Sequence, residues 1–165
     1  MTIYAHQIEE KRHMTHKNTD DPVVGGFDHR RALEILASGG PDAVKACAET
    51  VLNGLGEISV ITNRTGLAML PYQDTVRGTA FHLGEVLVAE AHIRVPDRGV
   101  EGYGAIVGRD LEHAMAVAVI DAAIAASHNI LSIVELLDAE CAHQEESDRE
   151  RLKKVEATRV QMETF

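Results

Sequence analysis

The segment Gly108–His113 (GRDLEH) combines residue types whose spacing suits the binding of an anion. We expect it to pass from the end of a strand into the first turn of a helix, where unpaired backbone N–H groups attract negative charge. With Arg109 and His113 beside those groups, a substrate phosphate or a partner's carboxylate fits there. The alternative, which we favour because helix starts far outnumber anion sites, is structural. In it Gly108 forms the corner, and Arg109 pairs with Asp110 or a neighbouring carboxylate.

Glu90, His92 and Arg94 form a second group of residues that could do chemistry. They alternate along a strand expected over residues 85–95, so all three face the same side of it. At that spacing they can hydrogen-bond each other or groups on adjacent strands, which suits general acid–base catalysis. The alternative, which we favour, is a polar sheet face turned to solvent or to another subunit, because antiparallel sheets usually have one such face.

Familiar catalytic motifs are absent from the sequence. There is no nucleophile elbow and no phosphate loop, and Glu112-His113 lacks the second histidine of a zinc-binding HExxH motif. Gly102, Gly104 and Gly108 do not have the spacing of a dinucleotide-binding loop, and most of them fall inside an expected strand. Glycine in a strand is typical of close packing against a helix, or of a bulge. The sequence therefore predicts no metal site and leaves the catalytic residues unknown.

Strands in the middle of the chain have to position these residues. The strand-forming segments, each bounded by turn residues, are 58–62, 67–70, 85–95 and 100–107. The first two are expected to form a hairpin around Asn63–Gly66, and a polar loop follows at 74–78. Pro96–Gly99 is expected to turn between the last two.

Helices flank the strands on both sides in the sequence. Asp28 is expected to cap a helix that ends at Gly39-Gly40, and Pro41 to open the next one. After the strands, Asp110 caps a helix to about Ala126 that is apolar nearly all round, so it has to be covered on most sides. Because the strands are grouped, the expected fold class is α+β: an antiparallel β-meander sheet with helices packed on one face and a long C-terminal helical arm.

Three regions are expected along the chain. Residues 1–26 are polar and form a flexible arm, whose three histidines at 6, 13 and 16 share no helical face and favour a solvated tail over a metal site. Residues 27–142 form the α+β domain. Residues 143–165 form an assembly segment, because a charged stretch is followed by apolar side chains that need a partner surface. These side chains are Leu152, Val155, Val160, Met162 and Phe165.

Overall charge and hydropathy narrow the classes of partner. The 165 residues carry a formal net charge of −10 at pH 7, which repels nucleic-acid phosphates and anionic membranes. The longest apolar run contains Asp121 and is too short to cross a bilayer, and the first residues lack the apolar core of a signal peptide. Cys47 and Cys141 lie on apolar helical stretches and are expected to be reduced. We therefore expect a cytoplasmic protein that binds neither nucleic acid nor membrane.

Three stretches stand out in combination: TAFHLGEVLVAEAHIRV, GYGAIVGRDLEHAMAVAVIDAA and, at the end of the chain, EATRVQMETF. Together they resemble the PhnG family, a subunit of the bacterial carbon–phosphorus lyase system, and the resemblance covers about residues 29–165. It transfers no catalytic role to this chain. The residues that match recognisable positions of the family's motifs are Gly108, Arg109, Asp110, His113 and Arg159.

This resemblance implies a core complex with PhnH, PhnI and PhnJ subunits. In that complex, with PhnI as the catalytic subunit, an alkylphosphonate displaces adenine from MgATP to give ribose 1-alkylphosphonate 5-triphosphate. The radical step that breaks the carbon–phosphorus bond belongs to PhnJ, which holds an iron–sulfur cluster and uses S-adenosylmethionine. The resemblance implies no cofactor bound by this chain itself, which fits its lack of a cysteine cluster. Three roles for this chain stay open. It can be a co-catalytic subunit that lends an arginine or histidine, a purely structural scaffold subunit or, more remotely, an independent enzyme.

Overall fold

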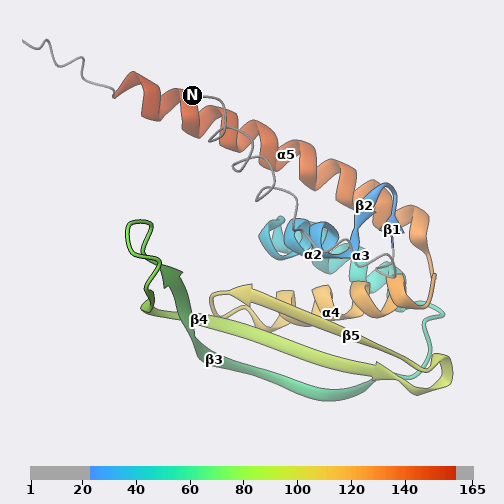
Figure 1. The fold of residues 1–165 in the computed structure, drawn as a ribbon. Helices are drawn as coiled ribbons and strands as arrows, with labels where there is room; N and C mark the ends of the chain where they lie inside the picture. Colours follow the sequence, from blue (N-terminus) through green and yellow to red (C-terminus); the bar gives the residue numbers. More distant parts are fainter. Residues whose placement is uncertain (1–22, 159–165) are drawn as a thin grey trace, which may run out of the picture.

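The computed structural model describes residues 23–158 as one α+β domain with two extensions (Figure 1). Short pairs of extended residues come first, then two helices, three long strands and two further helices. In chain order the elements are β1 (Val23–Val24), β2 (Phe27–Asp28), α2 (His29–Ser38), α3 (Pro41–Leu52), β3 (Ser59–Gln73), β4 (Ala80–Val95), the 3₁₀ turn η1 (Pro96–Arg98), β5 (Val100–Val107), α4 (Leu111–Ala125) and α5 (Ile130–Ala157).

The expected fold class is confirmed: the long strands form an antiparallel meander in the order β3-β4-β5, and the helices lie on one face of it. Helix α4 packs directly on β4 and β5, α2 and α3 pack over α4, and α5 lies across α2 and α3 (Figure 1). The opposite face of the sheet is not covered by any described element; we call it the open face. No helix within residues 23–158 is long and apolar enough to span a membrane.

Strand β4 shows the period of two that its sequence predicts. Ala89, Ala91, Ile93 and Val95 are fully buried, whereas the residues between them point to the open face. Helix α4 is buried nearly all round, also as predicted, because it is held between the sheet and the other helices. The domain core is therefore built from small and branched aliphatic side chains on both sides of α4.

Gly102 and Gly104 bring β5 into very close contact with α4, which confirms the prediction of close helix packing. A Cβ atom added at Gly102 would lie 2.0 Å from the Ala118 carbonyl oxygen, and one at Gly104 would lie 2.2 Å from the Ala114 carbonyl oxygen. Only hydrogen fits at these two positions. The two glycines therefore set the spacing between the helix and the sheet.

The predicted hairpin at Asn63–Gly66 is wrong, because β3 runs without interruption from Ser59 to Gln73 and pairs with β4. Gly66 does not adopt a left-handed conformation here and is compatible with an extended strand. The chain turns instead at the polar loop of residues 74–78, where the Asp74 carboxylate accepts hydrogen bonds from the backbone N–H groups of Val76 and Arg77. Strand β4 accordingly begins at Ala80, before the predicted start.

The β3–β4 hairpin extends well beyond the rest of the sheet. Strand β5 pairs with β4 only from Val88 to Val95, so residues 67–87 form a two-stranded ribbon with no third strand. We call these residues the hairpin arm. It extends past the helical layers, bends toward the side of the sheet that the helices cover, and ends at the 74–78 turn (Figure 1).

Helix α5 forms the second extension. Its first half packs on the domain through Ile133 and Leu137, and the Glu140 carboxylate accepts a 2.9 Å hydrogen bond from the backbone N–H of Gly40. The same helix continues through the charged stretch, where most side chains are exposed but Gln144 Nε2 donates a 2.9 Å hydrogen bond to the Ile35 carbonyl oxygen in α2. The boundary predicted between residues 142 and 143 therefore lies inside this helix. Leu152 and Val155 are 68% and 61% exposed. Val160, Met162 and Phe165 lie outside the described residues.

Candidate functional site

The start of α4 is occupied by the chain's own charges. The Asp110 carboxylate caps the helix by accepting a 2.9 Å hydrogen bond from the backbone N–H of His113, as its position predicts. It also accepts a 2.9 Å hydrogen bond from the Lys45 ammonium, which lies 3.3 Å from Glu112 as well. The bond from His113, and then the one from Lys45, hold the pKa of Asp110 below its ordinary value. Asp110 thus pairs with Lys45 and not with Arg109.

His113 points into the protein rather than toward the helix start. The ring is buried, and its Nε2 lies 3.0 Å from the carbonyl oxygen of Leu36 in α2. Because a carbonyl oxygen only accepts, Nε2 carries the proton and donates it. Gly108 forms the corner with a φ of 121°, and its N–H donates to the Leu87 carbonyl oxygen. Arg109 is exposed and makes no ion pair with any residue in the described range.

Glu90 lies in a hydrogen-bonded group on the open face. Its carboxylate accepts a 2.5 Å bond from Arg64 Nε on β3 and a 2.9 Å bond from the Tyr103 hydroxyl on β5. These bonds, with that from Arg64 the larger cause, lower the pKa of Glu90, while burial and the Glu90 carboxylate raise the pKa of Tyr103. Glu90 is therefore a stable carboxylate at neutral pH and is poorly suited to act as a general acid.

His92 and Arg94 share a different carboxylate. Glu101 on β5 lies 2.7 Å from His92 Nε2 and accepts a 2.8 Å hydrogen bond from Arg94 Nε. Arg94 first, and His92 second, lower the pKa of Glu101. The predicted residues Glu90, His92 and Arg94 thus lie on one face, but their bonds run to neighbouring strands rather than to each other.

Arg64, Glu101 and Tyr103 complete this open-face network, and the sequence interpretation missed all three. Arg64 falls in the segment 63–66 that the sequence predicts to turn. The partners on β5 depend on the strand register, which pairs His92 with Tyr103 and Arg94 with Glu101. Alternation along residues 101–103 places Glu101 and Tyr103 on one face of the strand and is the signal that could have identified these two. Beside the network, a shallow hollow of about 430 Å³ opens over Gly66 and Val88.

His29 and Asp121 form a further pair that sequence reasoning did not identify. Asp121 is nearly buried on α4; its Oδ1 lies 2.5 Å from His29 Nε2, and its Oδ2 accepts a 2.8 Å hydrogen bond from the backbone N–H of Tyr103. A buried carboxylate needs such partners to offset the cost of its desolvation. The pair therefore ties α4 to the start of α2 and to the free edge of β5. A single aspartate in the otherwise apolar run of residues 114–126 is the signal that the sequence offers.

A groove of about 420 Å³ runs beside this pair, between α2 and the free edge of β5. It is bordered mainly by apolar side chains, among them Leu33, Ala37, Ala105 and Val117. Within the described part of the chain, no three histidine, cysteine or acidic side chains gather in a way that could hold a metal ion. The predicted Arg159 and the three N-terminal histidines lie outside that part.

Fold and site together define a small α+β protein with one sheet face covered by helices and the other carrying a cross-linked network of charged side chains. The family described as phosphonate metabolism protein PhnG matches residues 28–165. The chain therefore belongs to the PhnG family.

Two curated proteins are similar to this chain. The alpha-D-ribose 1-methylphosphonate 5-triphosphate synthase subunit PhnG of Rhizobium meliloti is 31% identical over 149 residues, which cover 90% of this chain and 94% of that subunit. The 1-deoxy-11-beta-hydroxypentalenate dehydrogenase of Streptomyces arenae is 41% identical over 56 residues, which cover only 20% of that enzyme. The second similarity is confined to a short segment, so it carries no inference about activity.

Proposed function

We propose that this chain is a subunit of a cytoplasmic carbon–phosphorus lyase core complex in phosphonate catabolism. In that role it supports the transfer of an alkylphosphonate to C1′ of the ribose of ATP, with release of adenine. The observation that carries the proposal is the 31% identity to a synthase subunit that is matched over 94% of its length. Similarity along nearly the whole of both chains argues for the same role and not merely for a shared segment.

The proposed partners are the PhnH, PhnI and PhnJ subunits, with MgATP and an alkylphosphonate as the substrates of the complex. PhnI carries the displacement of adenine, and PhnJ carries the radical step with its iron–sulfur cluster and S-adenosylmethionine. This chain itself holds no cofactor in the proposal. Its contribution is to complete the assembly.

Reconstitution with one subunit left out tests the proposal. The four subunits are co-expressed with and without this chain, and adenine release from ATP and methylphosphonate is measured by chromatography. We expect release by the complete mixture and at least about a tenfold loss without this chain, equivalent to about 1.4 kcal/mol of transition-state stabilisation. Equal release from both mixtures would show that the chain has no part in the reaction.

A scaffold role is the form of the proposal that the site supports best. The carboxylates of Glu90, Glu101 and Asp110 are held ionised by partners within the chain. His113 donates its ring proton to a backbone carbonyl in the core. These groups are engaged in holding the domain together.

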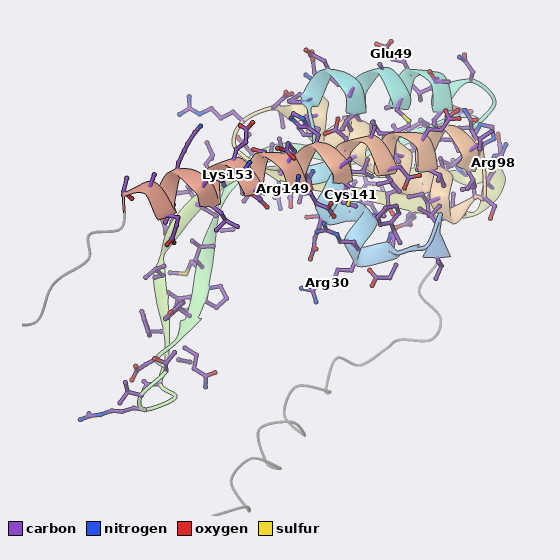
Figure 2. The ribbon with its side chains drawn as sticks, turned by 90° about the horizontal axis from the view of Figure 1, so that it is seen from above. Arg30, Glu49, Arg98, Cys141, Arg149 and Lys153 are labelled. Carbon is purple, nitrogen blue, oxygen red and sulfur yellow. The ribbon has the colours of Figure 1, made fainter. Side chains whose placement is uncertain are left out.

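A co-catalytic role remains the second candidate because Arg109 is exposed beside a helix start. If Arg109 contacts a substrate phosphate, Arg109→Ala will lower adenine release by the complete complex and leave its assembly unchanged. Arg30→Ala is the matched control, since Arg30 is an exposed arginine whose only described partner is Glu34 (Figure 2). Wild-type activity in the Arg109 variant would leave the scaffold role as the better account.

A further inference from the structure

The hairpin arm is the most apolar exposed part of the described structure. Between Leu67 and Leu87 it carries only three Asp, Glu, Lys or Arg residues, Asp74, Arg77 and Glu85. Seven of its large apolar side chains are between 42% and 88% exposed. They are Leu67, Met69, Leu70, Tyr72, Val76, Phe81 and Leu83.

Both faces of the arm carry these side chains. On the face continuous with the open face, Ala68 lies opposite Val86, and Tyr72 packs edge-on against Phe81 with ring centroids 5.3 Å apart. Leu67 and Leu87 are paired on the other face. A ribbon of two strands has no core of its own and is only marginally stable in water. We therefore expect both faces of the arm to be covered by another protein surface.

The size of this surface suits an interface with another protein. Monomeric proteins rarely expose apolar patches larger than about 300–600 Å². A specific interface buries about 800 Å² on each partner. Seven large side chains, each about half exposed or more, together with the backbone between them, supply an area of that order.

Charge indicates which protein covers the arm. A second copy of this chain would bring another net charge of −10, and two such bodies repel one another. The arm itself carries two anions and one cation, so it would not offset that repulsion. A different chain with an apolar, weakly charged surface has no such barrier.

We propose that the hairpin arm inserts into an apolar cleft of a different subunit and is the main docking element of this chain. The inference rests on the proposed function, which supplies a complex for the chain to join. Helix α5 projects from the domain on the same side as the arm, so one partner can contact both (Figures 1 and 2).

Three exposed leucines allow a matched test in the full-length chain. Leu67 and Leu83 lie on the arm and are 65% and 64% exposed, whereas Leu131 lies in the first turn of α5 and is 73% exposed. Each is changed to aspartate, and each variant is co-expressed with tagged PhnH, PhnI and PhnJ. The yield of this chain after tag purification reports docking, and circular dichroism with a thermal melt of the isolated chain reports folding. Light scattering reports its oligomeric state.

We expect Leu67→Asp and Leu83→Asp to fold normally and to co-purify at least about tenfold less, because each places a charge in a buried interface. Leu131→Asp should co-purify like the wild type. Normal co-purification of both arm variants would overturn the inference, as would an equal loss in the Leu131 variant or unfolding of the arm variants. A wild-type dimer that the arm variants lack would assign the arm to a second copy instead. If the wild-type chain itself fails to co-purify, the proposed function falls, and the inference with it.

Discussion

At the residue scale, Gly102 and Gly104 determine how closely α4 packs on the sheet, because their lack of a side chain lets α4 lie against the backbone of β5. The contact is between backbone groups, which have little freedom to move apart. Every other contact between helix and sheet depends on this spacing. Substitution here therefore tests the whole arrangement of the core.

Gly102→Ala should lower the free energy of unfolding by about 1–3 kcal/mol or more, because the added methyl group overlaps the Ala118 carbonyl. Gly66→Ala is the control: Gly66 lies in a strand with no atom within 4 Å of the added Cβ, so that variant should be neutral or more stable by up to about 1 kcal/mol. Urea denaturation measures both. Equal stabilities for the two variants would contradict the close packing.

Asp110 should make the stability of the domain depend on acid pH. Its folded pKa lies below the ordinary value of 3.8, so its charge stabilises the fold above that value, and the contribution is lost as pH falls through the folded pKa. Asp110→Asn keeps a residue that can cap the helix but removes the charge that Lys45 and the helix start favour. The variant should be less stable than the wild type at pH 7.

The difference in free energy of unfolding between the wild type and Asp110→Asn should shrink as pH is lowered from about 5 toward 2, where the wild-type carboxyl becomes protonated. Urea denaturation at several pH values measures it, with the exposed Asp138→Asn as a control for the loss of any surface carboxylate. A gap that stays constant over this range would mean that the Asp110 charge contributes nothing.

At the scale of the element, the first half of helix α5 packs on the domain and the second half projects into solvent. Cys141 lies where the helix crosses the domain, whereas Lys153 lies on the part that projects beyond it (Figure 2). Ile133 and Leu137 secure the first half in the core, while Leu152 and Val155 remain exposed. The projecting half thus keeps apolar side chains available for a partner.

Removing the chain from Leu152 onward should leave a folded domain that joins the complex poorly or not at all. Leu152 and Val155 are exposed and make no contribution to the core, but each large apolar side chain buried against a partner is worth about 1.5–3 kcal/mol. Circular dichroism with a thermal melt reports the fold, and co-purification with the partner subunits reports docking. The double variant Lys153→Ala/Lys154→Ala, which keeps the apolar residues, should co-purify normally.

This prediction has two clear ways to fail. A truncated chain that co-purifies like the wild type would show that the end of α5 has no role in assembly. A truncated chain that unfolds would place this segment in the domain's own core, against the exposure of Leu152 and Val155.

At the scale of the whole molecule, the chain is an α+β body with two extensions that leave it on the same side (Figure 1). The charged open face, the hairpin arm and the end of α5 are all exposed. Such a distribution suits a protein that completes its structure on contact with others.

The isolated chain should therefore not convert ATP and methylphosphonate. The reason is that its candidate acid–base groups are held in ion pairs and in bonds to the backbone of the same chain. Adenine release, followed by chromatography over hours with micromolar protein, should equal that of a sample without protein. Release above that background, retained through further purification, would mean that the chain is an enzyme by itself.

Local pattern was enough to predict several features of this protein. The period of two in β4, the aspartate caps at Asp28 and Asp110 and the apolar surface of α4 were all foreseen from the sequence. Each depends on residues within a few positions of one another, so the geometry of one helix or strand already determines it. Membership of the PhnG family could also be predicted, because it rests on stretches of sequence that the family shares.

The tertiary structure decided the features that join distant residues. Gly66 could have turned or extended, and pairing with β4 made it extended. Glu90 could have bonded His92, but the strand register placed Arg64 and Tyr103 beside it instead. His29 and Asp121 are 92 positions apart and meet only because α2 packs on α4. Sequence spacing carries no information about such contacts, since they depend on how whole elements pack and on the register between strands.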